Sequence, residues 1–129
     1  PDFLYHRIDE GVEVVRSIGR DNVKLCFDTF HVQTEEGGMA DRLRTAWPYI
    51  GHIQVGDVPG RHEPGTGEIR FPYLFGLIEE MGWNGWIGCE YAPSAHTLET
   101  LGWAAPYGIA GGGHPAMRTE GDRRHAQRG

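Results

Sequence analysis

Three side chains with metal-ligand chemistry follow the three most strand-like runs of this sequence. The run VKLCF is followed by Asp28, IGHI by Gln54 and WIGC by Glu90. Carboxylate and amide oxygens suit Mg²⁺ or Mn²⁺ better than zinc, which prefers His and Cys ligands. A polar residue after a single strand commonly just begins the next loop, but three in succession favour a shared oxygen-ligand cation site.

Two further polar side chains fall close to these strand ends. His31 lies three residues beyond Asp28, and Arg61 lies in the long loop GDVPGRHEPGTGEI after the second strand. An arginine can bind a carboxylate through two parallel hydrogen bonds. Two interpretations stay open for each: His31 is a site residue or an exposed loop histidine, and Arg61 is a substrate clamp or a surface salt bridge.

The sequence around these residues predicts strands that alternate with helices. Helical spacing of apolar residues predicts four helices, at 8–18, about 38–47, about 72–81 and about 97–103. Short apolar runs predict three strands, at 23–27, 50–55 and 86–89. One face of the first helix carries its apolar residues, Ile8, Val12, Val15 and Ile18. Such alternation is typical of a parallel α/β sheet, in which the three strand ends lie at one edge.

Size and composition indicate the class of molecule. The chain has 129 residues with 20 glycines, 8 prolines and 39% hydrophobic residues, which suits a loop-rich α/β unit. A complete (β/α)8 barrel needs about 250 residues. We therefore expect the C-terminal half of a longer protein, with three βα units over residues 1–107 and a disordered tail over 108–129.

Charge and cysteine usage narrow the possible partners and location. The formal net charge is −6 with dispersed basic residues, so no nucleic-acid-binding stripe is predicted. No apolar run reaches the roughly 18 residues of a membrane span. Cys26 and Cys89 fall on non-adjacent predicted strands, so we expect two small buried thiols, no disulfide and a cytoplasmic location.

Longer stretches resemble the hydroxypyruvate isomerase family, a group of xylose-isomerase-like barrels that includes the 2-oxo-tetronate isomerases. These stretches are FDTFHVQ, IGHIQVGDVPGRHEPGTGEI, GWNGWIGCEY and LETLGW. The resemblance implies the C-terminal half of a (β/α)8 TIM barrel. It also implies a divalent cation, Mg²⁺ or Mn²⁺, held by Asp28, Gln54 and Glu90 together with a glutamate on the preceding strand, which this sequence does not contain.

The same resemblance implies a reaction on a small hydroxy or oxo acid. Hydroxypyruvate, or a 2-oxo-tetronate, would be converted to its aldehyde isomer of the tartronate semialdehyde type through a metal-stabilised enediolate. Glu90 would be one of two carboxylates that share the proton transfer, and His31 and Arg61 would line the substrate pocket. Because the second carboxylate is implied on the preceding strand, we expect this chain by itself to be inactive.

Two alternatives stay open. A metal-dependent ketose 3-epimerase of the same superfamily resembles this chain, but those proteins typically carry His where Gln54 stands. The other alternative is a non-catalytic half-barrel, whose open sheet edges would invite association. Homo-oligomerisation of the intact parent also stays open. A zinc endonuclease on a similar barrel would need more histidine ligands and a basic face.

Overall fold

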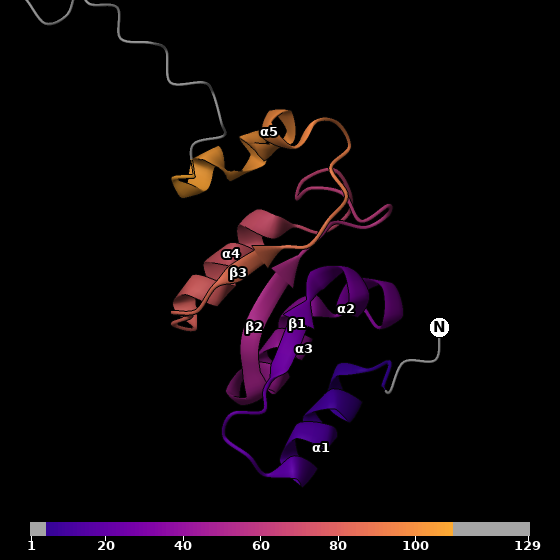
Figure 1. Cartoon of the computed structure of the whole chain (residues 1–129), viewed down its shortest axis with the longest axis vertical. Helices are drawn as coiled ribbons and strands as arrows, with labels where there is room; N and C mark the ends of the chain where they lie inside the picture. The colour runs from indigo at the N-terminus through magenta and orange to yellow at the C-terminus, as the bar shows by residue number, and fades with distance from the viewer. Residues whose placement is uncertain (1–4, 110–129) are drawn as a thin grey trace, which may run out of the picture. The chain divides into compact units, whose positions relative to one another are not determined.

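The computed structural model describes residues 5–109 (Figure 1). Its elements are α1 (Ile8–Ile18), β1 (Leu25–Asp28), α2 (Thr29–Glu35), α3 (Met39–Ala46), η1 (Trp47–Tyr49), β2 (Ile50–Val55), α4 (Phe71–Glu80), β3 (Ile87–Cys89), α5 (Thr97–Thr100) and η2 (Leu101–Tyr107). The chain divides into two compact units, Pro1–Ser94 and Ala95–Gly129. From position 110 onward the predicted disordered tail lies outside the described residues. Every helix in the described range is too short or too polar to traverse a lipid bilayer.

The three strands form one parallel sheet in the order β1-β2-β3. Residue Asp28 of β1 pairs with Gln54 of β2, and Gln54 pairs with Gly88 of β3. This register places the carboxyl ends of the three strands side by side. The predicted α/β architecture with a parallel sheet is confirmed, and the first and third strands begin one or two residues later than predicted.

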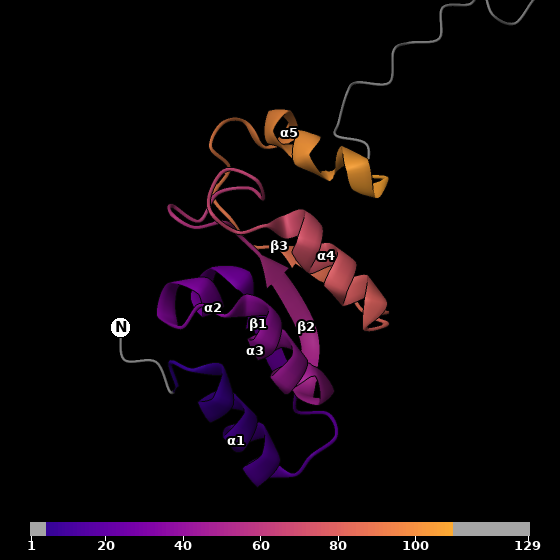
Figure 2. The same cartoon turned by 180° about the vertical axis from the view of Figure 1, so that it is seen from behind.

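The sheet has one apolar and one polar face because successive side chains of a strand point to opposite sides. Phe27, Ile53 and Val55 are completely buried. Helices α3 and α4 lie over one side of the strands (Figure 2). The other face carries Cys26 and Gln54, and Cys26 is exposed. Burial of the apolar face supplies the main stabilisation of this unit, while the polar face remains available for chemistry.

The two cysteines are free, but the prediction that they are buried was wrong. Cys26 is exposed because it lies on the polar face of β1. Cys89 is exposed on β3, where the side chains of Trp86 and Ile87 are also 86% and 37% exposed. The apolar composition of this strand predicted burial, whereas its position at the edge of the sheet leaves it accessible.

Helix α2 was not predicted, since the sequence pattern left His31 in a loop. The helix begins because Asp28 is its N-cap: Oδ1 accepts hydrogen bonds from the backbone N–H groups of Phe30, at 2.9 Å, and His31, at 3.4 Å. Seven residues are too few for a clear helical period, so the cap was the only available signal. His31 therefore lies in the first turn of a helix.

Helix α1 confirms most of its predicted apolar face. Ile8, Val12 and Val15 are buried, whereas Ile18 is 46% exposed, so its assignment to the core was wrong. Ile18 is the last residue of the helix and precedes Gly19, whose φ of 61° ends the helix in the left-handed conformation. The chain leaves the core at this point, before the Ile18 side chain can be covered.

Candidate functional site

Five side chains meet at the carboxyl ends of the strands. The Nη2 atom of Arg61 lies 2.7 Å from Asp28 Oδ2 and 3.8 Å from Glu90 Oε1. His31 Nε2 lies 3.8 Å from the same Asp28 oxygen. Gln54 Nε2 lies 3.5 Å from Glu90 Oε2. The structure thus brings all five sequence-selected residues into one network, which we call the rim site.

Asp28 is held at the rim by the backbone that surrounds it. Its side chain is 9% exposed, and its Oδ1 is engaged by the N-terminus of α2. The next residue, Thr29, joins the ends of β1 and β2, because its Oγ1 donates to Gly56 O at 2.9 Å and accepts from Gly56 N at 3.0 Å. Asp28 Oδ2 is consequently directed toward Arg61 and His31.

Arg61 reaches the rim site from the long loop after β2. Its Nε donates to the backbone oxygen of Glu90 at 3.1 Å, and its guanidinium carbon lies 5.1 Å from the ring centroid of Phe30. Its own backbone oxygen accepts from Ala92 N at 2.8 Å. With these contacts and a nearly buried partner in Asp28, this ion pair differs from the solvent-exposed salt bridges that contribute little stability.

The donor set of the rim site fits a hard divalent cation. One guanidinium nitrogen contacts both Asp28 and Glu90, so the two carboxylates converge on a single positive charge. With the amide of Gln54 they provide oxygen donors, the kind that Mg²⁺ and Mn²⁺ prefer. Between residues 5 and 109 no group of three or more His, Cys, Asp or Glu side chains is placed to hold an ion. The rim site has two such carboxylates, and its third donor is an amide.

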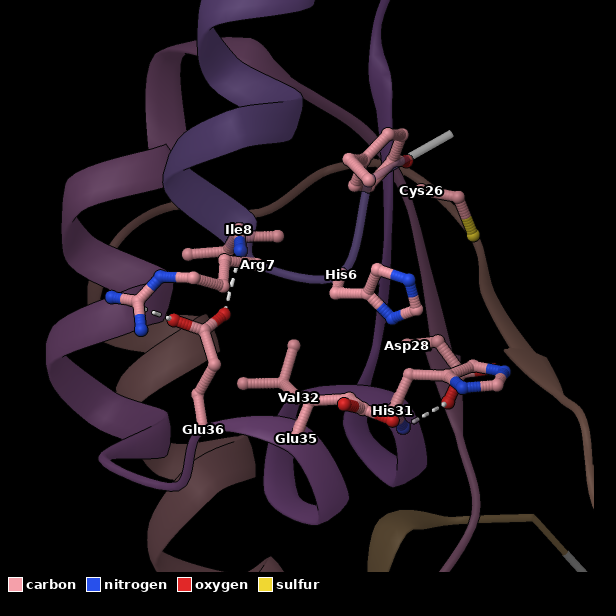
Figure 3. A pocket seen from close by; sticks show the side chains of 10 residues that line it. His6, Arg7, Ile8, Cys26, Asp28, His31, Val32, Glu35 and Glu36 are labelled. Atoms are coloured by element: carbon pink, nitrogen blue, oxygen red, sulfur yellow. Dashed lines mark hydrogen bonds and ion pairs between the residues drawn. The ribbon is translucent and has the colours of Figure 1, made fainter. Parts of the chain in front are cut away.

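A cavity of about 300 Å³ opens beside Asp28 (Figure 3). Its walls come from the start of α1, from β1 and from α2, and they include His6 and His31. The wall opposite these histidines is closed by Glu36, which accepts a hydrogen bond from Ile8 N at 2.6 Å. A cavity of this volume suits a small ligand, and the Asp28 carboxylate links it to the rim site.

Three residues that support the rim site are absent from the sequence-based prediction. Thr29 joins two strand ends, Phe30 lies beneath the Arg61 guanidinium, and Asp57 is completely buried in the long loop. Thr29 and Phe30 lie within the stretch FDTFHVQ, but the family resemblance assigned no role to either residue. For Asp57 the glycine-rich composition of the loop was a signal, but it identified the loop rather than the residue.

Comparison with known proteins places this architecture in a family. The family described as xylose isomerase-like TIM barrel matches residues 1–107, and the chain belongs to it. A crystal structure from Brucella melitensis, described as AP endonuclease, family 2, has a TM-score of 0.80 and 37% identity. That match covers 83% of this chain and 42% of the other. The predicted fold class, part of a TIM barrel of this family, is confirmed.

Two curated relatives carry isomerase names. The 2-oxo-tetronate isomerase of Cupriavidus necator is 45% identical over 107 residues, which is 83% of this chain and 41% of the relative. The hydroxypyruvate isomerase of Escherichia coli is 39% identical over 107 residues, which is 83% of this chain and 42% of the relative. The chain therefore spans about two fifths of the length of these relatives.

Proposed function

We propose that the protein is a metal-dependent isomerase that interconverts hydroxypyruvate, or a 2-oxo-tetronate, and its aldehyde isomer. The observation that carries this proposal is the convergence of Asp28 and Glu90 on one positive charge, with Gln54 beside them. The names of the two relatives support an isomerase reaction. Gln54 further supports the isomerase over a ketose 3-epimerase, for which the family resemblance implies His at this position.

In this proposal Glu90 transfers a proton. The isomerisation moves a proton between two neighbouring carbons, so a base must remove it from one carbon and an acid must return one to the other. Glu90 is exposed at the end of β3, and both of its carboxylate oxygens lie near nitrogen donors, Oε1 near Arg61 and Oε2 near Gln54. These neighbours orient the carboxylate. The family resemblance assigns the second carboxylate to the preceding strand.

Asp28, Gln54 and Glu90 would hold the divalent cation, with Mg²⁺ or Mn²⁺ as the proposed metal. When bound, such a cation supplies Lewis-acid stabilisation of the negative charge that develops on the substrate oxygens. Arg61 provides a forked cationic donor that matches a carboxylate, and His31 adds a ring nitrogen at the same rim. This combination suits a small acid that carries a carboxylate next to a carbonyl.

The proposed setting of the reaction is the cytoplasm. Both cysteines, Cys26 and Cys89, are free thiols, which is typical of proteins in a reducing compartment. The proposed partner is the small oxo acid itself. The chain of 129 residues by itself is expected to lack turnover, because the second proton-transfer carboxylate is assigned outside it.

The isomerase proposal is tested by turnover of hydroxypyruvate by the full-length protein with Mn²⁺, followed by NMR of the aldehyde product. We expect Glu90→Gln to lower kcat at least about a hundredfold, because a neutral amide cannot accept the proton. The same variant should still bind Mn²⁺ detectably. Glu79→Gln on the exposed side of α4 is the matched control and should keep full turnover. Unchanged kcat in Glu90→Gln would remove Glu90 from the proton transfer.

A further inference from the structure

One buried carboxylate organises the long loop that follows β2. Asp57 has 0% exposed surface. Its Oδ1 accepts hydrogen bonds from the backbone N–H groups of Val58, at 2.8 Å, and Ile69, at 3.0 Å. Its Oδ2 accepts from the backbone N–H groups of Gly65 and Gly67, both at 2.9 Å. A single side chain therefore joins the start of the loop to its end.

Backbone hydrogen bonds close the same loop on either side of Arg61. The N–H of Asp57 donates to His62 O at 2.9 Å, and the N–H of Glu68 donates to Val58 O at 2.8 Å. Arg61 itself has a φ of 55°. This left-handed conformation is uncommon for a residue with a side chain, and it persists where the surrounding structure holds it. The hydrogen bond from the Asp57 N–H to His62 O closes the turn that contains Arg61.

The glycines of the loop are required by this arrangement. Gly65 has a φ of 93°, in the left-handed region that favours glycine. A Cβ at Gly67 would lie 2.0 Å from Val58 O and 2.8 Å from Asp57 Oδ1. A side chain at position 67 would therefore push against the same backbone and carboxylate that hold the loop closed.

We propose that Asp57 is a positioning residue that acts on the rim site through Arg61. Four backbone N–H groups engage its two oxygens, so it organises the loop and does not contact substrate. The loop conformation that it holds places Arg61 Nη2 at 2.7 Å from Asp28 Oδ2 and Arg61 Nε at 3.1 Å from Glu90 O. Only the effect of Asp57 on turnover rests on the proposed isomerase function.

The test follows hydrogen exchange at the Nε–H group of Arg61 by NMR, in the full chain labelled with ¹⁵N-arginine. Asp57→Asn keeps the shape of the side chain but replaces one acceptor oxygen by an NH₂ group, which cannot accept from the loop amides. We expect Arg61 Nε–H exchange to accelerate at least about tenfold, because the loop opens locally. The Nε–H of Arg42, which pairs with Glu36 at 3.2 Å in a separate cluster, should keep its rate.

Two more variants separate positioning of Arg61 from a general loss of stability. Val15→Ala removes buried apolar atoms in α1, far along the chain from the loop. This variant should lower the unfolding temperature of the protein but leave Arg61 exchange slow. Gly67→Ala keeps Asp57 intact but disturbs its contacts, and it should reproduce the fast exchange. Unchanged Arg61 exchange in both loop variants, or equal acceleration in Val15→Ala, would overturn the proposal.

The turnover measurement gives an independent readout in the full-length protein. Asp57→Asn should raise KM for hydroxypyruvate by a larger factor than it lowers kcat. In an Arg61→Ala background the same substitution should leave KM unchanged, because the residue through which Asp57 acts is gone. An equal rise of KM in both backgrounds would contradict the coupling. If the wild-type protein shows no isomerase activity, the proposed function fails while the exchange result still decides the role of Asp57.

Discussion

Asp28 uses its two carboxylate oxygens for different purposes. Oδ1 caps helix α2, and Oδ2 faces Arg61 and His31 in the rim site. The residue type and its place after an apolar run were enough to select Asp28 from the sequence. Its capping role was not predicted, because it depends on the backbone turning directly into a helix at Thr29. Residue type and position in the sequence are therefore enough to select a site residue, whereas its contacts depend on the backbone conformation around it.

At the residue scale, the Thr29 hydroxyl is the most direct test of how the strand ends are joined. Thr29→Val keeps the shape but leaves the buried N–H and C=O of Gly56 without this partner. We expect a loss of about 1–3 kcal/mol in the free energy of unfolding, measured by urea titration. Thr29→Ser retains the hydroxyl and should lose less. Equal stability of Thr29→Val and the wild type would show that the hydroxyl does not join the strands.

At the scale of elements, the loop after β2 and the segment after β3 support each other. His62 Nδ1 lies 2.6 Å from Ala92 O, and Arg61 O accepts from Ala92 N. Glu63 accepts hydrogen bonds from both the backbone N–H and the hydroxyl of Ser94. The apolar runs predicted β1 and β2 because burial sets their pattern, whereas β3 was predicted from its apolar composition although its residues are largely exposed. The loop contacts carry no period, so only their glycine and proline content was visible in the sequence.

Acid destabilisation tests this contact between the two segments. Desolvation raises the pKa of Glu63, but the hydrogen bonds from Ser94, together with contributions from its own backbone and from His62, more than offset it, so the net pKa lies below the ordinary value of 4.5. A lowered folded-state pKa stabilises the protein above 4.5, and this contribution is lost as the pH falls through the folded-state pKa.

We therefore expect Glu63→Gln to flatten the decline of unfolding free energy between about pH 5 and about pH 3. Urea titrations across that range measure the decline. Glu79→Gln, an exposed carboxylate on α4, serves as the control and should leave the slope as in the wild type. An identical slope in Glu63→Gln would contradict the pairing with Ser94.

At the scale of the whole molecule, the described residues are a section of a family barrel. The parallel sheet follows from apolar strands that alternate with helices, which is why the fold class could be predicted. The residues of the rim site could be predicted as well, because the carboxyl ends of strands in a parallel sheet meet at one edge. The exposure of the thiols could not be predicted, because Cys26 is exposed by the face of β1 on which it lies and Cys89 by the position of β3 at the edge of the sheet.

The Mn²⁺ affinity of the full-length protein, measured by electron paramagnetic resonance, tests the rim site most directly. Asp28→Asn preserves the cap of α2, since asparagine also caps helices, but removes a charged ligand. We expect Kd to rise at least about tenfold, because ligand charge sets the affinity of such sites. Arg61→Ala should lower the Kd for Mn²⁺ several-fold, because the variant removes a positive charge that competes with the cation for the two carboxylates.

Glu79→Gln, on the exposed side of α4, controls for net charge and should leave Kd unchanged. The account predicts opposite shifts in Kd for Asp28→Asn and Arg61→Ala. A wild-type Kd in Asp28→Asn, or a weakening in Arg61→Ala as large as in Asp28→Asn, would contradict a cation site formed by these residues.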